Sequence, residues 1–330
     1  MINKPVFITW APSYNRSTAL AEEIGLEPIF IGNVSKHKNS FSALWDFLGW
    51  SYQNIKLIKV RRPSHIAIAN THGVVAAVNF VFGKLYGAKI ILDSHSAAFD
   101  APFYKYPKFL SYFFAKNALF SIVTNEVHQK NIEKKGGKAF LLPDIPNDAQ
   151  LVTNNKKKIS ENFSVCFICT YNYDEPYEEV LKAAESLPTI QFFFTGNYKS
   201  KIKEPEKHKN VIFTGYLPDE DYKNLINNVD ALLVLTTREN TMQHGGSEAI
   251  SIEKPFITSN THMLKSYFKK GAVFVSNDRS GIVKGILEIK EHYSKYQNDI
   301  RLMKEIRNQI FLENIEKIKQ QVDQSTFKIY

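Results

Sequence analysis

Cysteine is almost absent from this sequence of 330 residues, which contains only Cys166 and Cys169, three positions apart in a short apolar run. A Cys-x-x-Cys pair can serve redox chemistry or zinc, but no second pair is present to complete a metal site. On a strand, residues i and i+3 point to opposite faces. We therefore expect two buried structural thiols, which suit a reducing cytoplasm.

Long uncharged apolar stretches are missing too. No run approaches the roughly 20 residues that span a bilayer. The N-terminal residues lead directly into the apolar run Val6–Trp10 and do not have the profile of a signal peptide. Internal repeats, low-complexity tracts and nucleic-acid-binding motifs are also not found. The expectation is a cytoplasmic globular protein with no nucleic-acid partner.

Acidic residues are scarce only in the first half. Residues 1–150 hold 17 Lys and Arg against 10 Asp and Glu, a net charge of +7, whereas residues 151–330 hold 25 against 23. A basic N-terminal half favours an anionic neighbour, either a polyanion or an anionic lipid surface. The length suits two domains, and 44% hydrophobic residues are enough to fill their cores.

Apolar runs of strand length alternate with helical patterns along the first half. This rhythm predicts a parallel sheet with helices on both faces and a ligand at the carboxyl ends of the strands. The predicted strands are Val6–Trp10, Pro28–Ile31, Ile55–Val60, Ile66–Asn70, Lys89–Asp93 and Ser121–Thr124, and the predicted helices are Thr18–Ile24, Phe41–Tyr52, Val74–Tyr86 and Pro107–Ala118.

A second alternating set runs from Ser164 to Val275, after a linker that comprises Leu141–Pro146 and the polar residues 147–162. Residues from Ser280 to about Gln324 are charged, nearly free of glycine and predicted to be helical. The fold class is therefore α/β, with two Rossmann-like domains that face a cleft. We place them at 1–150 and 151–308, followed by a C-terminal helix at 309–330.

The most informative segment is Gln243–Pro255, which lies between the apolar runs 231–237 and 256–259. Its order predicts a strand, a glycine-bearing loop, a short helix and a second strand. Such a loop offers backbone N–H groups and the positive end of a helix to a ligand, and phosphate is the usual occupant. Glu248, in the first turn, is placed to reach a ribose hydroxyl beside that phosphate.

The pattern Gly-x-x-Glu-Ala-x-x-x-x-Lys-Pro-x-Ile at Gly245–Ile257 resembles the donor-site signature of GT-B-fold nucleotide-sugar glycosyltransferases, in particular the glycogen-synthase-like, sugar-retaining branch (family 4-like). Other segments agree with the same family in order and spacing. They are Asp93–His95, Phe192–Gly196, Phe213–Tyr222 and Asp230–Leu235. In GT-B proteins the final helix often crosses back, so residues after about 308 are expected to pack on the N-terminal domain.

The resemblance implies a donor site in the C-terminal domain. The backbone at Gly215, Tyr216 and Leu217 would receive the nucleobase, and Glu248 the ribose. Two departures stand out: Asn240 replaces the family's first glutamate, with Glu239 adjacent, and Thr170–Glu175 holds no Arg or Lys for the diphosphate. The phosphate is then expected to meet Arg238, Thr241, His244, Gly245, Gly246 and Ser247.

The resemblance also implies catalytic residues at the edge of the N-terminal sheet. His95 would act near the reacting centre, and Asp100 is the alternative general base if the reaction inverts configuration. Tyr14, Asn15 and Arg16 follow the first strand, where Arg16 could hold a phosphate of the donor or of a lipid-diphosphate acceptor. Asp219-Glu-Asp221 has the spacing of a metal motif but follows Pro218 at a helix start, so no metal cofactor is expected.

Two aromatic-rich segments lie in the basic half. Residues 41–52 carry a stripe of Phe41, Leu44, Trp45, Leu48 and Tyr52, and residues 103–114 interleave aromatics with lysines. Such segments suit peripheral insertion at a membrane, although helix-on-sheet packing produces a similar pattern.

These features together predict a glycosyltransferase that moves a sugar from a UDP- or GDP-linked donor to a hydroxyl of a glycan or lipid-linked acceptor. Retention of configuration and a role in cell-surface polysaccharide or glycolipid synthesis are expected from the resemblance. Two alternatives remain open: a sugar-nucleotide epimerase of the same fold, and a non-catalytic sugar-nucleotide-binding protein.

Overall fold

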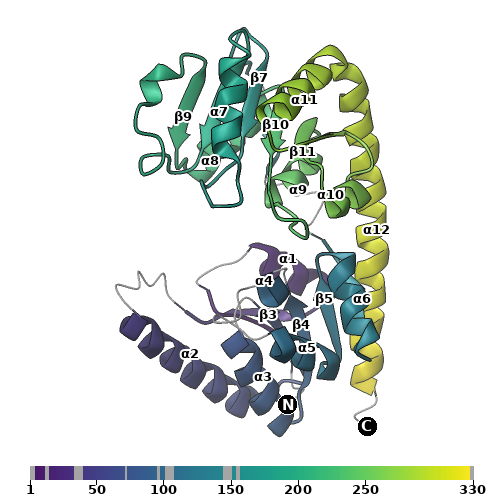
Figure 1. The fold of residues 1–330 in the computed structure, drawn as a ribbon. Helices are drawn as coiled ribbons and strands as arrows, with labels where there is room; N and C mark the ends of the chain where they lie inside the picture. The colour runs from purple at the N-terminus through teal and green to yellow at the C-terminus, as the bar shows by residue number, and fades with distance from the viewer. Residues whose placement is uncertain are drawn as a thin grey trace. The chain divides into compact units, whose positions relative to one another are not determined.

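The computed structural model describes residues 4–11, 15–32, 40–70, 73–94, 97–100, 108–143, 151–153 and 157–327. The chain divides into two compact units (Figure 1). Unit 1 combines Met1–Asp144 with Phe311–Tyr330, and unit 2 comprises Ile145–Ile310. Each unit is built on one six-stranded sheet in which every pair of neighbouring strands is parallel, so two Rossmann-like domains are confirmed.

Unit 1 has the strand order β2-β1-β3-β4-β5-β6. The central strands are buried along nearly their whole length, as near-continuous apolar runs in a parallel sheet should be. The strands are β1 (Val6–Thr9), β2 (Glu27–Phe30), β3 (His65–Asn70), β4 (Lys89–Ser94), β5 (Phe120–Val123) and β6 (Ala139–Leu141). The helices are α1 (Asn15–Glu23), α2 (Ser40–Arg61), α3 (Gly73–Leu85), α4 (Ala97–Asp100), α5 (Lys108–Asn117) and α6 (Glu126–Lys134).

Separate apolar clusters cover the two faces of this sheet. Helices α2, α3, α5 and α6 contribute to one cluster, in which Ile58 of α2 and Phe114 of α5 are buried. Helix α1 contributes Leu20 to the other cluster, together with Ile315 and Ile318 from the end of the chain. The expected return of the last helix to the N-terminal domain is therefore confirmed.

Unit 2 has the strand order β12-β11-β10-β7-β8-β9. Its strands are β7 (Ser164–Phe167), β8 (Gln191–Thr195), β9 (Val211–Gly215), β10 (Ala231–Val234), β11 (Phe256–Ser259) and β12 (Ala272–Val275). Its helices are α7 (Tyr177–Glu185), the 3₁₀ turn η2 (Pro205–Lys207), α8 (Asp219–Asn228), α9 (His244–Ser251), α10 (His262–Tyr267), α11 (Arg279–Glu291) and α12 (Tyr293–Phe327), which continues into unit 1.

The two cysteines behave as predicted. Both are buried and free. Cys166 belongs to the cluster that includes α8, α9 and α10, whereas Cys169 belongs to the cluster that includes α7 and α11. The thiols therefore serve opposite faces of the sheet, and burial raises the pKa of Cys166 well above its ordinary value.

One predicted strand was wrong. Ile55–Val60 is the C-terminal part of α2, a helix of 22 residues. The reason is that Asn54 and Ile58, one helical turn apart, are both buried, while Lys56, Lys59 and Val60 are exposed. The Asn54 amide donates to Oδ1 of Asn79 on α3 at 3.0 Å, which fixes this side of α2 inward. A short β-branched run does not by itself separate strand from helix.

Candidate functional site

The segment Gln243–Pro255 forms the strand–helix–strand unit that was predicted, with α9 between β10 and β11. Gly245, Gly246 and Ser247 do not lie in a loop, however. They form the first turns of α9 with the exposed His244 ahead of them, and all three are buried.

Close packing explains why the first turn of α9 is made of glycine. A Cβ at Gly246 would lie 2.5 Å from Cζ of Phe268, and one at Gly245 would lie 3.0 Å from a methyl group of Val234. Neither glycine has a positive φ. The absence of side chains therefore lets the start of α9 approach the carboxyl end of β10, rather than permitting an unusual turn.

The N-terminus of α9 is not capped by a side chain. Gln243, the residue before the helix, makes no capping hydrogen bond, because its Nε2 donates to the carbonyl of Leu235 at 2.6 Å. Ser247 adds a buried hydroxyl for which the described residues provide no hydrogen-bond partner. The backbone N–H of Gly246 donates to the carbonyl of Gln243 at 3.1 Å. The positive end of the helix dipole and the Ser247 hydroxyl together favour an anion at this position.

Glu248 is held in place by a tyrosine. Its side chain is in the second turn of α9, and Glu248 is 8% exposed. The hydroxyl of Tyr222, on α8, donates to Oε2 of Glu248 at 2.6 Å. Burial, followed by the charge of Glu248, raises the pKa of Tyr222, so the tyrosine stays protonated and remains a donor.

The predicted base-binding turn lies directly before α8. Gly215 ends β9 with a φ of +71°, a conformation that favours glycine, and Tyr216 beside it is 85% exposed. Pro218 precedes α8, and its carbonyl accepts from the backbone N–H of Tyr222 at 2.9 Å. Tyr222 therefore joins this turn to Glu248. The acidic triplet at Asp219 occupies the first turn of α8, as a helix start predicts.

The loop after β7, where the family carries basic residues, is closed by carboxylates. Oε2 of Glu175 accepts from the backbone N–H groups of Thr170 and Asn172 at 2.9 and 2.8 Å. Asp174 accepts from the hydroxyl of Thr236, just after β10, at 2.8 Å. The loop is thus tied to the segment that leads to Arg238 and is acidic rather than basic.

Glu239, which is adjacent to the position of the family's first glutamate, contacts a helix start. Its Oε1 accepts from the backbone N–H of His262 at 2.6 Å, at the start of α10. Arg238 and Thr241, on the same connection, are half-buried. Glu239 thus has the position and charge of a residue that stabilises a helix start.

Arg16 is not available for a phosphate, so that expectation was wrong. The residue is buried, and its Nε and Nη2 donate to the two carboxylate oxygens of Asp93 at 3.3 and 3.1 Å. Nη2 and Nη1 also donate to the carbonyls of Leu142 and Pro143 at 2.9 and 3.1 Å. The pair locks the carboxyl ends of β4 and β6 to the start of α1, so Asp93 has a structural role.

The other predicted residues of unit 1 lie at the limits of the described structure. His95 and Tyr14 are outside the described residues. Asn15 begins α1 and Asp100 ends α4, but their side chains are not described.

Two side chains near α9 had no predicted role. Tyr222 was visible only as the last residue of the base-turn segment, and its position one helical turn after Pro218 was the available signal. Lys254 donates to the carbonyls of Asn227 and Val229 at 3.0 and 2.5 Å and so caps the C-terminus of α8. Its place in the family pattern is therefore explained by structure.

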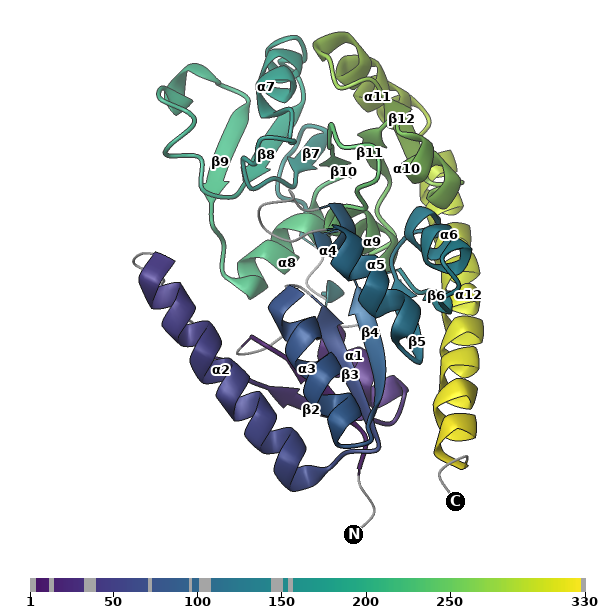
Figure 2. The same cartoon turned by 60° about the horizontal axis from the view of Figure 1, so that its bottom comes forward.

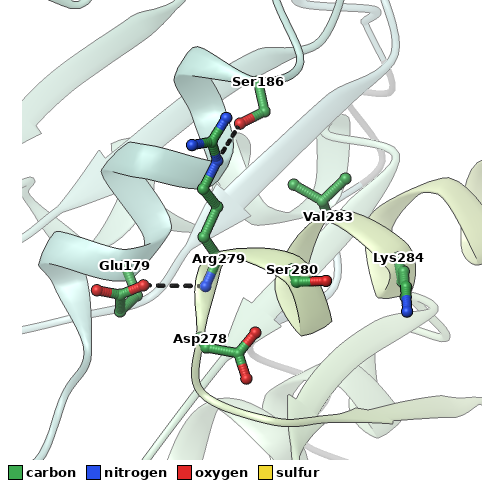
Figure 3. Close-up of a pocket in the computed structure, with 7 residues that line it drawn as sticks. All are labelled: Glu179, Ser186, Asp278, Arg279, Ser280, Val283 and Lys284. Carbon is green, nitrogen blue, oxygen red and sulfur yellow. Dashed lines mark hydrogen bonds between the residues drawn. The ribbon is translucent and has the colours of Figure 1, made fainter.

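A surface pocket of unit 2 lies elsewhere and shares no residue with α9 (Figure 3). Arg279 spans it by donating from Nε to the hydroxyl of Ser186 and from its backbone N–H to Glu179. Glu179 also forms an ion pair with Lys182 on its own helix, α7. The pocket is lined by Glu179, Ser186, Asp278, Arg279, Ser280, Val283 and Lys284.

No group of three or more His, Cys, Asp or Glu among the described residues could hold a metal ion. None of the described helices is long and apolar enough to cross a membrane.

Comparison with known proteins assigns the fold. Residues 150–305 match the family described as glycosyl transferases group 1. HepE of Anabaena, solved in complex with UDP, is 13% identical with a TM-score of 0.70 over 98% of this chain and 100% of that one. Sucrose-phosphate synthase of Thermosynechococcus elongatus is 12% identical with a TM-score of 0.73 over 99% of each chain.

A UDP-N-acetylglucosamine 2-epimerase is also similar, at 12% identity and a TM-score of 0.62 over 90% of each chain. No curated protein matches the chain by sequence. The chain thus has the GT-B fold, and the resemblance to GT-B glycosyltransferases is confirmed. These matches do not single out the glycogen-synthase-like branch.

Proposed function

We propose that the protein transfers a sugar from a nucleoside-diphosphate donor, UDP- or GDP-linked, to a hydroxyl of a glycan or lipid-linked acceptor. The observation that carries this proposal is the start of α9, where the positive end of the helix, the buried hydroxyl of Ser247 and the buried Glu248 stand together at the carboxyl edge of the sheet. The match to the group 1 glycosyltransferases covers this segment. The similarity to HepE, solved with UDP-glucose, favours a UDP-sugar.

In this proposal the donor binds unit 2 and the acceptor binds unit 1. The diphosphate meets the N–H groups of α9 with Arg238 and His244 nearby, and the ribose meets Glu248. Stabilisation of the leaving diphosphate by fixed dipoles and cations lowers the barrier of the transfer step. His95 is assigned to the reacting centre in a retaining reaction and Asp100 to proton abstraction in an inverting one.

The cellular setting proposed is the cytoplasm, at the inner face of a membrane where cell-surface polysaccharide or glycolipid is built. Support comes from the basic N-terminal half, with a net charge of +7 over residues 1–150. A lipid-linked acceptor would bring such a surface close to anionic headgroups. No metal cofactor is assigned, because the acidic triplet at Asp219 is explained as a helix start.

Incubation with UDP- and GDP-sugars, with and without hydroxyl acceptors, tests the proposal. Nucleotide release that depends on an acceptor is the expected result, and a chain that binds neither nucleotide contradicts it. Glu248→Ala should weaken UDP binding. Glu288→Ala is the matched control. Glu288, on α11, also accepts a hydrogen bond from a tyrosine hydroxyl, that of Tyr296 on α12, and neither residue belongs to α9. Equal UDP affinity in both variants would remove Glu248 from the site.

The second candidate is a sugar-nucleotide epimerase, which the similarity to UDP-N-acetylglucosamine 2-epimerase favours. An epimerase changes the configuration of the sugar on its nucleotide and needs no acceptor. Epimerised nucleotide-sugar in the incubation without acceptor would therefore replace the first proposal. Binding without turnover would instead indicate a non-catalytic sugar-nucleotide-binding protein, a reading that the acidic loop after β7 supports.

A further inference from the structure

Helix α2 carries an apolar stripe that is not part of the core. Trp45, Leu48 and Tyr52 are 61%, 51% and 68% exposed. They recur at helical spacing, so they share one side of α2. This side faces solvent, whereas the sequence pattern alone was equally compatible with packing on the sheet.

The opposite side of α2 supplies the packing contacts. Phe47 and Trp50 lie against Trp10, with ring centroids 6.3 and 6.2 Å apart. Trp50 also covers Gly32, where a Cβ would come within 3.3 Å of its ring. The core therefore has its own aromatics on this helix, and the stripe is additional to them.

Two neighbouring helices extend the feature. Helices α2, α3 and α5 pack side by side on one face of the sheet of unit 1, as Figures 1 and 2 show. Val81 and Leu85 on α3 and Phe109 and Phe113 on α5 are more than half exposed. The ring of Phe113 lies 6.2 Å from that of Phe80, which links the exposed groups of α5 and α3.

The charges among these groups have one sign. Lys56 and Lys59 follow the stripe on the exposed side of α2, and Lys84 and Lys116 are exposed on α3 and α5. The sequences of the three helices contain a single acidic residue, Asp46, which is half-buried. Exposed aromatic and aliphatic groups with lysines between them are the composition of an interfacial surface, since lysine stems cover apolar area while the ammonium reaches outward.

We infer that the outer face of α2, α3 and α5 docks on an anionic lipid bilayer, with Trp45, Leu48 and Tyr52 entering the headgroup region and the lysines meeting lipid phosphates. The inference extends the proposed function, because it places unit 1, to which the acceptor is proposed to bind, at a membrane surface. It does not depend on the donor or its chemistry. Apolar insertion and electrostatic attraction act together here, as stable peripheral binding requires.

A second copy of the chain fits the face less well. The cores of protein interfaces are depleted of lysine, and a twofold contact would set lysines of one copy near those of the other. Lipid headgroups instead supply the opposite charge. Tryptophan and tyrosine also gather at the boundary between hydrocarbon and water, because one end of each ring system is apolar and the other polar.

Co-sedimentation of the full chain with lipid vesicles tests this. We expect binding to phosphatidylcholine vesicles that contain phosphatidylglycerol, and weak binding to phosphatidylcholine alone. Because partition scales with inserted apolar area, Trp45→Ser, Leu48→Ser and Tyr52→Ser combined should reduce it by about tenfold or more. Lys56→Gln with Lys59→Gln should also reduce it by about tenfold and weaken its salt dependence, while Lys84 and Lys116 retain the rest.

Ile212→Ser with Leu287→Ser is the matched control, because both residues are exposed apolar groups of unit 2. This variant should bind vesicles as the parent chain does. Absence of binding to anionic vesicles, or equal binding by the stripe variant and the control, overturns the inference. A concentration-dependent dimer in lipid-free solution that the stripe variant abolishes also overturns it, in favour of a second copy.

UDP affinity of each variant separates this inference from the proposed function. The stripe variant should keep the UDP affinity of the parent chain, since its changes lie in unit 1. If the parent binds vesicles but no nucleotide, the transferase proposal fails and the membrane surface stands. If the parent binds nucleotide but no vesicles, the membrane inference fails and the transferase proposal stands.

Discussion

Tyr222→Phe is the most direct test of how the donor site is built. The substitution removes one hydroxyl and keeps the ring, which packs in the cluster of α8, α9 and α10. Glu248 then loses the donor at 2.6 Å that fixes its Oε2. A hydrogen bond to a charged group is worth about 1.5–3 kcal/mol, so unit 2 should lose up to that free energy of unfolding.

The effect on ligand binding is smaller and has a separate cause. A carboxylate that is no longer held must be ordered when the ribose arrives, and ordering one side chain costs about 0.5–1.5 kcal/mol. UDP affinity should therefore fall between about twofold and tenfold. Tyr222 acts here as a positioning residue for Glu248 and not as a contact of the ligand.

Isothermal titration with UDP measures the affinity, and urea unfolding measures the stability. The matched control is Tyr296→Phe, which deletes a similar hydroxyl, 2.9 Å from Glu288, between α12 and α11. It should lower stability and leave UDP affinity unchanged. In a Glu248→Ala background, which has no acceptor for the hydroxyl, the effect of Tyr222→Phe on affinity should vanish, because the two residues act as a unit. Stability loss with unchanged UDP affinity would refute the reasoning.

Three further predictions concern the scaffold. His65 is fully buried against Ser325, and burial, followed by the charge of Lys89, lowers its pKa from 6.5 to about 4. Because the unfolded chain then binds the proton more readily, the free energy of unfolding of unit 1 should fall by about 2 kcal/mol between pH 8 and pH 5. Urea unfolding at several pH values measures this, and His65→Gln should flatten the dependence. In Gly246→Ala the new Cβ would lie 2.5 Å from Phe268, so the free energy of unfolding should fall by about 1–3 kcal/mol. Gly49→Ala, at an open helical position, should instead raise it by about 0.5–1 kcal/mol. Equal changes of stability in the two variants, measured by thermal unfolding, would disprove the packing argument. Asp93→Asn breaks the buried pair with Arg16 and should destabilise unit 1 by about 3–5 kcal/mol in the same assay, and a change below 1 kcal/mol would count against the clamp.

The sequence predicted the architecture of unit 2 better than that of unit 1. Apolar runs of strand length flank α9 closely, so the strand–helix–strand order could be predicted from one segment, even though the glycine pair and Lys254 contact residues far along the chain. Ile55–Val60 was assigned to the wrong element, since its helical character depends on Asn54 and Ile58 facing α3 and the sheet. A short segment of sequence does not predict which other helices it will contact.

The side-chain partners of the site could not be predicted for a related reason. Arg16 and Asp93 are 77 positions apart, and Tyr222 and Glu248 are 26 apart. Each pair meets because parallel strands end, and the helices that follow them begin, at the same edge of a sheet. The sequence showed which residues could bind an anion or a ribose, but not which of them the fold had already engaged.

The loop after β7 shows what such engagement means for chemistry. Glu175 closes the loop through two backbone N–H groups, and Asp174 ties it to Thr236. Replacing either carboxylate by a cation would break these bonds, so the basic pair of the family could not be restored there without rebuilding the loop. In the proposed donor complex, the negative charge of the diphosphate would therefore be balanced by groups outside this loop. Arg238 and His244, on the segment that follows β10, and the N-terminus of α9 are candidates for this role.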